Sequence, residues 1–266
     1  MKIEMVFCLL LAILYSNFSF GQDKYLDVDG ISLRYVEAGE GVPVILMHGF
    51  GGNLDMWLNT DIFHTLAETF HVIAFDARGH GLSDKPHNPD FYGANMAKDA
   101  LSLMDYFGYE KAHVVGYSMG ARLTGYLLGT YPERLLSATL GASPPRRNWD
   151  ETQEERARQF IANAQEQERN KSPSDTQDYR ALMAIPNSWK SQSITDDQIS
   201  DNEVPTFAIV GSRDPRVSGL QDLLAVMPNM ELVIIEGATH GGEDGLPRRP
   251  EFIEKLNNFL IANSDQ

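Results

Sequence analysis

Short, almost continuous apolar runs recur along the chain. They occupy residues 43–47, 72–75, 112–116, 135–140, 206–210 and 232–235. A strand that is apolar at every position, without alternation, is typical of a sheet covered on both faces. Between the runs, apolar residues at spacings of three and four predict helices. The clearest examples are Ala97, Ala100, Leu101, Met104 and Phe107, and then Leu123, Tyr126 and Leu127. Strands that alternate with helices predict an α/β fold with a parallel sheet between helical layers.

The N-terminal part of this pattern differs from the rest. Residues 25–38 contain two runs rich in β-forming residues on either side of Asp29-Gly30. An Asp-Gly pair between two such runs is a strong signal for a tight turn. The sequence therefore predicts an antiparallel hairpin ahead of the parallel strands.

Residues 146–203 interrupt the alternation, because they contain no strand-like run and are rich in charge. A single apolar stripe runs along one otherwise charged helix, and it consists of Ala157, Phe160, Ile161 and Ala164. Such a stripe requires a surface to pack on. We interpret residues 146–203 as a small helical cap inserted into a core formed by residues 22–145 and 204–266. A disordered linker is the alternative, supported only around residues 171–174.

The first residues have the pattern of a secretory signal peptide. Lys2 precedes a ten-residue apolar run at 6–15, and small residues stand at Ser19 and Gly21, where a signal peptidase would cleave. The run is shorter than the roughly 20 residues of a membrane-spanning helix. We expect removal of residues 1–21 and export to the periplasm or the medium, without stable membrane insertion. An uncleaved anchor and a buried N-terminal helix are the alternatives.

Composition narrows the choice of ligands. The chain has 266 residues, and 37 acidic against 22 basic side chains give a formal charge of −15. Nucleic-acid binding depends on clustered Lys and Arg, so this balance argues against a nucleic-acid partner. It favours a small neutral or cationic ligand. The single cysteine, Cys8, lies in the predicted leader, so we expect neither a disulfide nor a thiolate metal site, and no metal or cofactor.

The strongest chemical signal is the pentapeptide Gly-Tyr-Ser-Met-Gly at residues 116–120. It lies between a predicted strand and a predicted helix, where a sharp turn would raise the Ser118 side chain above the sheet. Small residues two positions before and after the serine relieve crowding in such a turn. The pattern identifies Ser118 as a candidate nucleophile.

A serine hydroxyl needs a base to remove its proton. Among seven histidines, His240 follows the last apolar strand directly, in a glycine-flanked loop. Asp214 follows the preceding strand by four residues. Loops that leave parallel strands meet at one sheet edge, so we expect Ser118, Asp214 and His240 to form a catalytic triad in that chain order.

The negative charge that develops on a substrate carbonyl needs hydrogen-bond donors. Met119 offers its backbone N–H at the start of the predicted helix. The glycine-rich loop at residues 48–52 follows the first apolar strand, and the Phe50 N–H is the natural second donor. We expect His48 to brace this loop by hydrogen bonds and to play no part as a base.

Taken together, these motifs closely resemble the α/β-hydrolase family. The resemblance covers about residues 25–262, apart from the cap, and also includes the stretches 76–84, 131–134, 211–215 and 237–240. It implies an eight-stranded, mostly parallel sheet whose second strand is antiparallel, flanked by helices and carrying a helical cap. In this family the 76–84 stretch is a structural loop, so Asp76, Arg78 and Ser83 receive no catalytic role.

The resemblance also limits the chemistry. Haloalkane dehalogenases and epoxide hydrolases of this fold carry Asp at the nucleophile position, so Ser118 argues against both. Carboxylesterases, perhydrolases, carbon–carbon bond hydrolases and proline aminopeptidases keep serine. We favour a carboxylesterase, because ester hydrolysis requires least beyond a triad and an oxyanion hole. A triad-retaining small-molecule receptor and a non-catalytic homologue are the alternatives outside enzymology.

Substrate size should depend on the cap. Its apolar residues are few, and we expect the pocket wall to consist of Phe160, Ile161, Met183 and Trp189. A wall this small can bury only a few methylenes, each worth about 0.8 kcal/mol. The sequence therefore predicts a preference for short acyl chains. A purely structural role for these residues, fastening the cap to the core, is the alternative.

Overall fold

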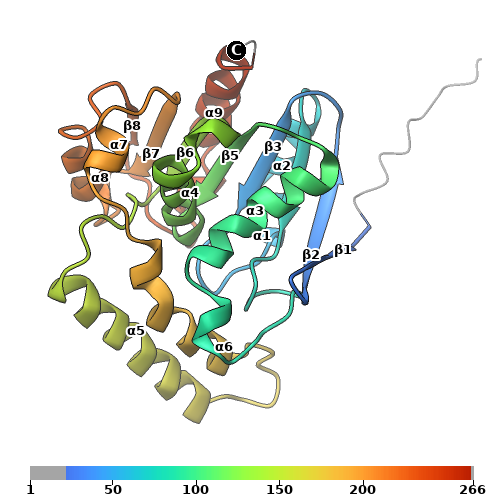
Figure 1. The fold of residues 1–266 in the computed structure, drawn as a ribbon, viewed down its shortest axis with the longest axis vertical. Helices are drawn as coiled ribbons and strands as arrows, with labels where there is room; N and C mark the ends of the chain where they lie inside the picture. Colours follow the sequence, from blue (N-terminus) through green and yellow to red (C-terminus); the bar gives the residue numbers. More distant parts are fainter. Residues whose placement is uncertain (1–21, 265–266) are drawn as a thin grey trace, which may run out of the picture.

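The computed structural model describes residues 22–264 and contains one eight-stranded sheet (Figure 1). The predicted leader, residues 1–21, lies outside the described residues. The strands are β1 Lys24–Val28, β2 Ile31–Ala38, β3 Pro43–Met47, β4 His71–Phe75, β5 Ala112–Tyr117, β6 Leu135–Gly141, β7 Thr206–Gly211 and β8 Glu231–Ile235. Their order across the sheet is β1-β2-β4-β3-β5-β6-β7-β8. All six apolar runs and the N-terminal hairpin are therefore strands, as predicted.

Strand β2 is antiparallel to both of its neighbours, β1 and β4, whereas β3 to β8 are mutually parallel. The predicted mostly parallel eight-stranded sheet with an antiparallel second strand is confirmed. Because β3 to β8 run in one direction, the loops that follow β3, β5, β7 and β8 emerge at the same edge. These loops contain the candidate chemistry.

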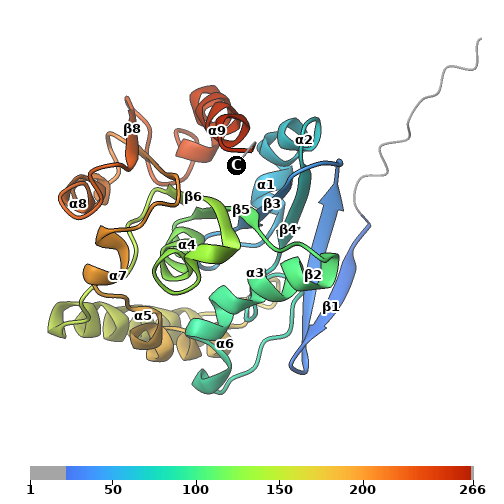
Figure 2. The ribbon, with the colours of Figure 1, turned by 45° about the horizontal axis from the view of Figure 1, so that its top comes forward.

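Helices cover both faces of the sheet (Figure 2). The α-helices are α1 Asp55–Leu58, α2 Ile62–Ala67, α3 Ala94–Phe107, α4 Met119–Thr130, α5 Glu151–Arg169, α6 Tyr179–Ala184, α7 Asp197–Ser200, α8 Val217–Leu223 and α9 Pro250–Ala262. Short 3-10 helices are η1 Pro89–Phe91, η2 Pro132–Arg134, η3 Pro186–Gln192 and η4 Leu246–Arg248. Helices α3, α4 and α8 contribute to one core cluster, and α2 and α9 to the cluster on the opposite face.

Successive residues of the central strands enter opposite clusters. In β3, Ile45 and Met47 lie on the α3 and α4 face, whereas Val44 and Leu46 lie on the α2 and α9 face. All four are at most 2% exposed. Burial on both faces explains why these runs show no alternation in the sequence.

The last strand departs from this expectation. In β8, Ile234 is 40% exposed and Leu232 and Val233 are only half-buried. The sequence predicted a strand covered on both faces, and for β8 that prediction is wrong. The reason is its position, since β8 pairs only with β7 and forms the edge of the sheet.

The segment between β6 and β7 is helical, with α5, α6, η3 and α7. Helices α5 and α6 lie across one end of the sheet in both views (Figures 1 and 2), whereas α7 contacts the C-terminal part of α4. On α5, Ala157 and Ala164 are buried and Phe160 and Ile161 are half-buried. The apolar stripe therefore faces the rest of the protein. Within residues 22–264, no helix is sufficiently long and apolar to cross a membrane.

A buried ion pair joins the loop after β4 to helix α3. The Arg78 guanidinium donates two hydrogen bonds to the Asp99 carboxylate, at 2.8 and 2.5 Å, and one to the Phe91 carbonyl at 2.7 Å. Asp99 is fully buried and Arg78 is 4% exposed. Burial raises the pKa of Asp99 to about 6, against the opposing influence of Arg78. Without Arg78, this carboxyl would be a buried group with no compensating charge.

We expect Arg78→Met to lower the free energy of unfolding by about 3 kcal/mol, measured by denaturant titration near neutral pH. Loss of the guanidinium raises the pKa of Asp99 further, so the folded variant takes up a proton that the unfolded chain lacks. The deficit relative to the wild type should therefore shrink as the pH falls from about 8 to about 6. The double variant Arg78→Met/Asp99→Leu should recover most of the loss. A single variant as stable as the wild type would contradict this account.

Candidate active site

The candidate nucleophile occupies a strained turn between β5 and α4. Ser118 has φ 54° and ψ −102°, a conformation that non-glycine residues rarely adopt. A Cβ atom on Gly116 would lie 2.2 Å from the Gly120 carbonyl carbon, and one on Gly120 would lie 2.1 Å from the Met47 carbonyl oxygen. Both positions must therefore be glycine. The backbone contacts that exclude larger residues place Ser118 directly beside the end of β3.

Three side chains from three strand ends meet at this turn. His240, in the loop after β8, places its Nε2 atom 2.9 Å from the Ser118 Oγ. Its Nδ1 atom lies 2.5 Å from an oxygen of Asp214, in the loop after β7. With Nδ1–H donated to the carboxylate, Nε2 is free to accept the serine proton. The structure thus brings together all three residues predicted for the triad.

The electrostatic state of Asp214 suits this arrangement. The residue is 1% exposed, and burial by itself would raise its pKa. Hydrogen bonds from His240 and from the Arg216 N–H, together with the charges of these two residues, outweigh burial and lower the pKa of the carboxyl. Asp214 is therefore ionised and can fix the tautomer of His240 and stabilise its protonated form.

Tyr117 contributes a contact that sequence reasoning missed. Its hydroxyl donates a 2.5 Å hydrogen bond to the His240 carbonyl oxygen, and its ring stacks on the imidazole at a centroid distance of 5.4 Å. Burial raises the pKa of Tyr117, so the hydroxyl keeps its proton and acts as a donor. The residue is thus a positioning residue for His240. The only sequence signal was its place beside Ser118, where many residue types are compatible with the turn.

The predicted oxyanion donors lie on two segments that touch. The His48 carbonyl accepts a 3.0 Å hydrogen bond from the Gly120 N–H, which ties the loop after β3 to the start of α4. A Cβ atom on Gly49 would lie 3.4 Å from the Ser118 Cβ, so this loop passes directly beside the serine. Throughout residues 22–264, no acceptor is found for the Phe50 N–H. The Met119 N–H lies in the first turn of α4, where no helical carbonyl is available.

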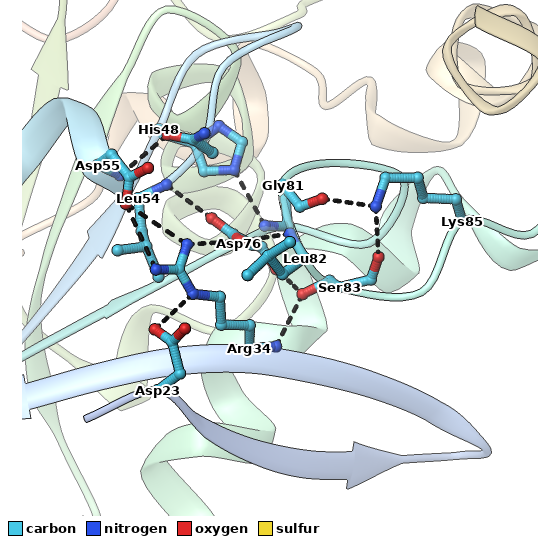
Figure 3. A network of polar contacts seen from close by, with 12 residues as sticks. Asp23, Arg34, His48, Leu54, Asp55, Asp76, Gly81, Leu82, Ser83 and Lys85 are labelled. Carbon is cyan, nitrogen blue, oxygen red and sulfur yellow. Dashed lines mark hydrogen bonds and ion pairs between the residues drawn. The ribbon is translucent and has the colours of Figure 1, made fainter. Parts of the chain in front are cut away.

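A buried carboxylate fixes the far end of the same loop (Figure 3). Asp76, which is fully buried, accepts hydrogen bonds from the backbone N–H groups of Leu54 and Leu82, both at 2.7 Å, and a longer one from Arg34 at 3.2 Å. The Ser83 hydroxyl donates to the Asp76 carbonyl at 2.6 Å. These contacts account for Asp76 and Ser83 as structural residues.

His48 fixes the near end of the loop. Its Nε2 atom accepts a 3.0 Å hydrogen bond from the Ala77 N–H, and its Nδ1 atom lies 2.7 Å from the Gly49 carbonyl. Burial lowers the pKa of His48, so the imidazole is neutral and can accept at one nitrogen while it donates at the other. The histidine therefore braces the loop through hydrogen bonds and lies away from the triad's proton path.

One cavity opens onto Ser118, and another is lined by Arg122, one turn further along α4. The first, which we call the serine cavity, has a volume of about 320 Å³ and is lined by Ser118, His240, Phe50, Met56 and Arg248, among others. The second, which we call the arginine cavity, has a volume of about 440 Å³. It lies between α4, α5 and the segment after β6, and four of its lining residues are arginines: Arg122, Arg146, Arg147 and Arg156.

The four cap residues predicted to form the wall of the substrate pocket do not surround Ser118. None of Phe160, Ile161, Met183 and Trp189 lines the serine cavity. Phe160 and Trp189 line the arginine cavity, and Trp189 is 2% exposed. Their rings pack edge-on against each other and against Phe50, with centroid distances of 5.0 to 6.4 Å. Ile161 and Met183 are half-buried and line neither cavity.

Comparison with known proteins identifies the family. A family model described as the alpha/beta hydrolase fold matches residues 42–183, which is more than half of the chain. The chain therefore belongs to this family. Its relatives include hydrolases that act on several kinds of bond.

Among curated relatives, the acetyltransferase component of an acetoin cleaving system from Cupriavidus necator is 44% identical over 119 residues, which are 44% of this chain and 31% of that protein. A soluble epoxide hydrolase from Corynebacterium is 38% identical over 99 residues, 37% of this chain and 34% of that one. The 2-hydroxy-6-oxo-6-phenylhexa-2,4-dienoate hydrolase of Comamonas testosteroni is 36% identical over 118 residues, 44% of this chain and 41% of that one. The matches thus span about a third to two fifths of these relatives.

Solved structures match over nearly the whole fold. A thermophilic esterase from Thermogutta terrifontis, with malate bound, superposes with a TM-score of 0.74 at 23% identity and covers 91% of this chain and 99% of its own. An enol-lactonase from Burkholderia xenovorans gives 0.71 at 20% identity, with coverage of 91% and 100%. At these identities the similarity shows the shared fold.

The Tyr117 contact can be tested by removing one oxygen atom. We expect Tyr117→Phe to lower kcat/KM by about fivefold, since a hydrogen bond of about 1 kcal/mol to the His240 backbone is lost. KM should change little, because the hydroxyl is engaged by the His240 carbonyl and acts by positioning the base. Tyr25→Phe, at an exposed position in β1, is the matched control. Equal kinetics for the two variants would remove Tyr117 from the site.

Proposed function

We propose that this protein is a serine hydrolase that cleaves carboxylic esters through an acyl-enzyme intermediate on Ser118. The observation that supports this most directly is the unbroken chain of hydrogen bonds from Ser118 through His240 to the ionised Asp214. The loop that carries Phe50 and the first turn of α4, which carries Met119, both adjoin Ser118. Ester hydrolysis requires a nucleophile, a base and an oxyanion site, and this arrangement offers all three.

In the first step, His240 Nε2 removes the proton of the Ser118 hydroxyl while Oγ attacks the ester carbonyl carbon. The carbonyl oxygen becomes an oxyanion and accepts hydrogen bonds from the Phe50 and Met119 N–H groups. The protonated His240 is stabilised by Asp214 and then gives its proton to the alcohol oxygen as the carbon–oxygen bond breaks. The alcohol leaves, and the acyl group remains esterified to Ser118.

In the second step, water replaces the alcohol. His240 takes a proton from the water molecule, whose oxygen attacks the acyl carbon and regenerates the oxyanion. Collapse of this intermediate breaks the bond to Ser118, and His240 returns its proton to the serine oxygen. The acid product leaves, and the enzyme is restored.

These roles orient the substrate between the two cavities. His240 must protonate the departing oxygen, so the alcohol lies on the side of the serine cavity, which His240 lines. The acyl group then extends to the opposite side of Ser118, towards the cap and the arginine cavity. That cavity has polar, charged walls with only Phe160 and Trp189 as large apolar residues, which favours short acyl chains.

We also propose that the protein works outside the cytoplasm. The support is the sequence pattern of residues 1–21, with a basic residue, a short apolar run and small residues before Gln22. Export would expose the enzyme to small esters in the periplasm or the medium.

The nucleophile can be tested chemically. A fluorophosphonate probe should label Ser118, and Ser118→Ala should abolish the labelling. Ester hydrolysis by that variant should fall by about three to six orders of magnitude, since triad members act as a unit. Ser218→Ala, at an exposed position in α8, should keep both properties. If the Ser118 variant retained most of its activity, the nucleophile would lie elsewhere.

Chain-length preference tests the acyl side of the proposal. With p-nitrophenyl esters of increasing length, we expect kcat/KM to be highest at about two to four acyl carbons. It should then fall at least about tenfold by eight carbons, because further methylenes would meet charged groups instead of apolar surface. The measurement is a steady-state assay below the solubility limit of each ester. Faster cleavage of long-chain triglyceride emulsions than of short esters would contradict it.

A further inference from the structure

The arginine cavity concentrates positive charge in a strongly acidic protein. Arg122 comes from α4, Arg146 and Arg147 from the segment after β6, and Arg156 from α5. The formal charge of the whole chain is −15, so four arginines around one cavity run against its general composition. Their origin in three separate segments means that only the fold assembles them.

Most of this charge has no internal counter-ion. Arg147 pairs with Asp196 on α7, but no ion pair to Arg122, Arg146 or Arg156 is found within residues 22–264. The Arg122 Nε donates only to the neutral Ser143 hydroxyl, at 3.1 Å. Arg156 is exposed and Arg122 half-buried, but Arg146 is buried, and a buried guanidinium without a carboxylate partner is costly in a folded protein.

Arg146 is the most notable member of the group. It is 7% exposed, its Nε has no hydrogen-bond partner in the described part of the chain, and its guanidinium carbon lies 3.6 Å from the centroid of the Trp189 ring. Stacking on an aromatic face stabilises a cation and leaves the edge of the guanidinium, with its N–H groups, available to a ligand.

The electrostatic environment of Arg146 also favours a bound anion. Burial lowers the pKa of Arg146 most, and repulsion from Arg122 and Arg156 lowers it further. Burial likewise lowers the pKa of Arg122, to about 10. Both groups remain charged near neutral pH, because arginine keeps its proton in proteins. A bound anion would relieve the mutual repulsion.

The carboxylates near the cavity do not neutralise it. Asp150 and Asp222 line its rim and are exposed to solvent. Asp150 already accepts a hydrogen bond from the Gln153 N–H as the N-cap of α5. Neither forms an ion pair with Arg122, Arg146 or Arg156.

The cavity lies within reach of the serine. Arg122 is four residues after Ser118, and its N–H donates a 3.3 Å hydrogen bond to the Ser118 carbonyl, so the two residues are one turn of α4 apart. Ser143, which accepts from Arg122, follows Gly141 by two residues, and the Gly141 carbonyl accepts the Ser118 N–H at 2.8 Å. These contacts place Ser118 next to the part of α4 that carries Arg122, a lining residue of the arginine cavity and on the side to which we assign the acyl group.

We propose that the arginine cavity binds a carboxylate carried by the acyl part of the substrate, so that the enzyme acts on half-esters of dicarboxylic acids. This inference rests on the proposed ester hydrolysis, and it reverses the expectation of a neutral or cationic ligand drawn from the net charge. Arg146 forms the floor of the site, and the planar fork of its N–H groups matches the two oxygens of a carboxylate. The scissile ester remains neutral and lies at Ser118.

The kinetic test compares two esters of the same diacid, monoethyl adipate and diethyl adipate, by titration of released acid. We expect the wild type to favour the half-ester by roughly tenfold or more in kcat/KM. Arg146→Met should reduce that ratio by at least about tenfold, and Arg146→Lys should restore part of it. Arg158→Met, an exposed arginine of α5 outside the arginine cavity, is the charge-matched control and should leave the ratio unchanged. No preference in the wild type, or an unchanged ratio in Arg146→Met, would overturn the inference.

A binding experiment separates this inference from the proposed activity. The Ser118→Ala variant should bind monoethyl adipate, measured by calorimetry, and addition of Arg146→Met should weaken binding by about tenfold or more. Inorganic phosphate, tested in parallel, should bind more weakly than the half-ester; if it bound more tightly, a carboxylate would be the wrong ligand. Loss of binding in the double variant, together with no hydrolysis of any ester by the wild type, would support the anion site and overturn the ester hydrolysis. Hydrolysis of neutral esters without half-ester binding would do the reverse.

Discussion

The contact between the backbone of the Ser118 turn and the end of β3 is the constraint on which the rest of the site depends. Gly120 lies so close to the Met47 carbonyl that a single added carbon would overlap it. The same contact brings the start of α4 against the loop that carries Phe50, through the Gly120 N–H bond to the His48 carbonyl. The same backbone contact therefore positions both the nucleophile and the segments that carry the oxyanion donors. These backbone contacts hold Ser118 at its positive φ, since they leave no room for another conformation of the turn.

That packing would be of little use if the loop after β3 could move. Two buried groups of the neighbouring strand end prevent this: Asp76 accepts the Leu54 N–H, and the Ala77 N–H bonds to His48. The glycine-rich part of the loop lies between these two fixed points. Flexible residues are thus confined to the stretch that must approach a substrate. Preorganised donors of this kind stabilise a developing charge without having to reorganise during the reaction.

Much of the fold and of the candidate site could be predicted from the sequence, because the signals for them lie in short stretches of residues. Apolar runs buried on both faces have a distinct pattern, and the glycines at 116 and 120 belong to a recognisable sequence motif around Ser118. Ser118, Asp214 and His240 follow strands whose common direction fixes a common edge. The exposure of Ile234 could not be predicted, because strand order decides which strand forms the edge. Tyr117 was missed for a similar reason, since its partner lies 123 residues away in the chain.

The arginine cavity shows that the net charge of a protein does not predict the charge of an individual cavity. Net charge sums over the surface, and in water containing salt most of those charges are screened within about 10 Å. Inside a cavity the screening is weaker, so the pKa of Arg146 is lowered most by burial and then by the nearby Arg122 and Arg156. The acidic exterior still has a physical consequence, because it repels anions before they reach the cavity. An anionic substrate would therefore associate faster as ionic strength rises. Its contacts with the buried Arg146 would weaken less with added salt than contacts with exposed charges would.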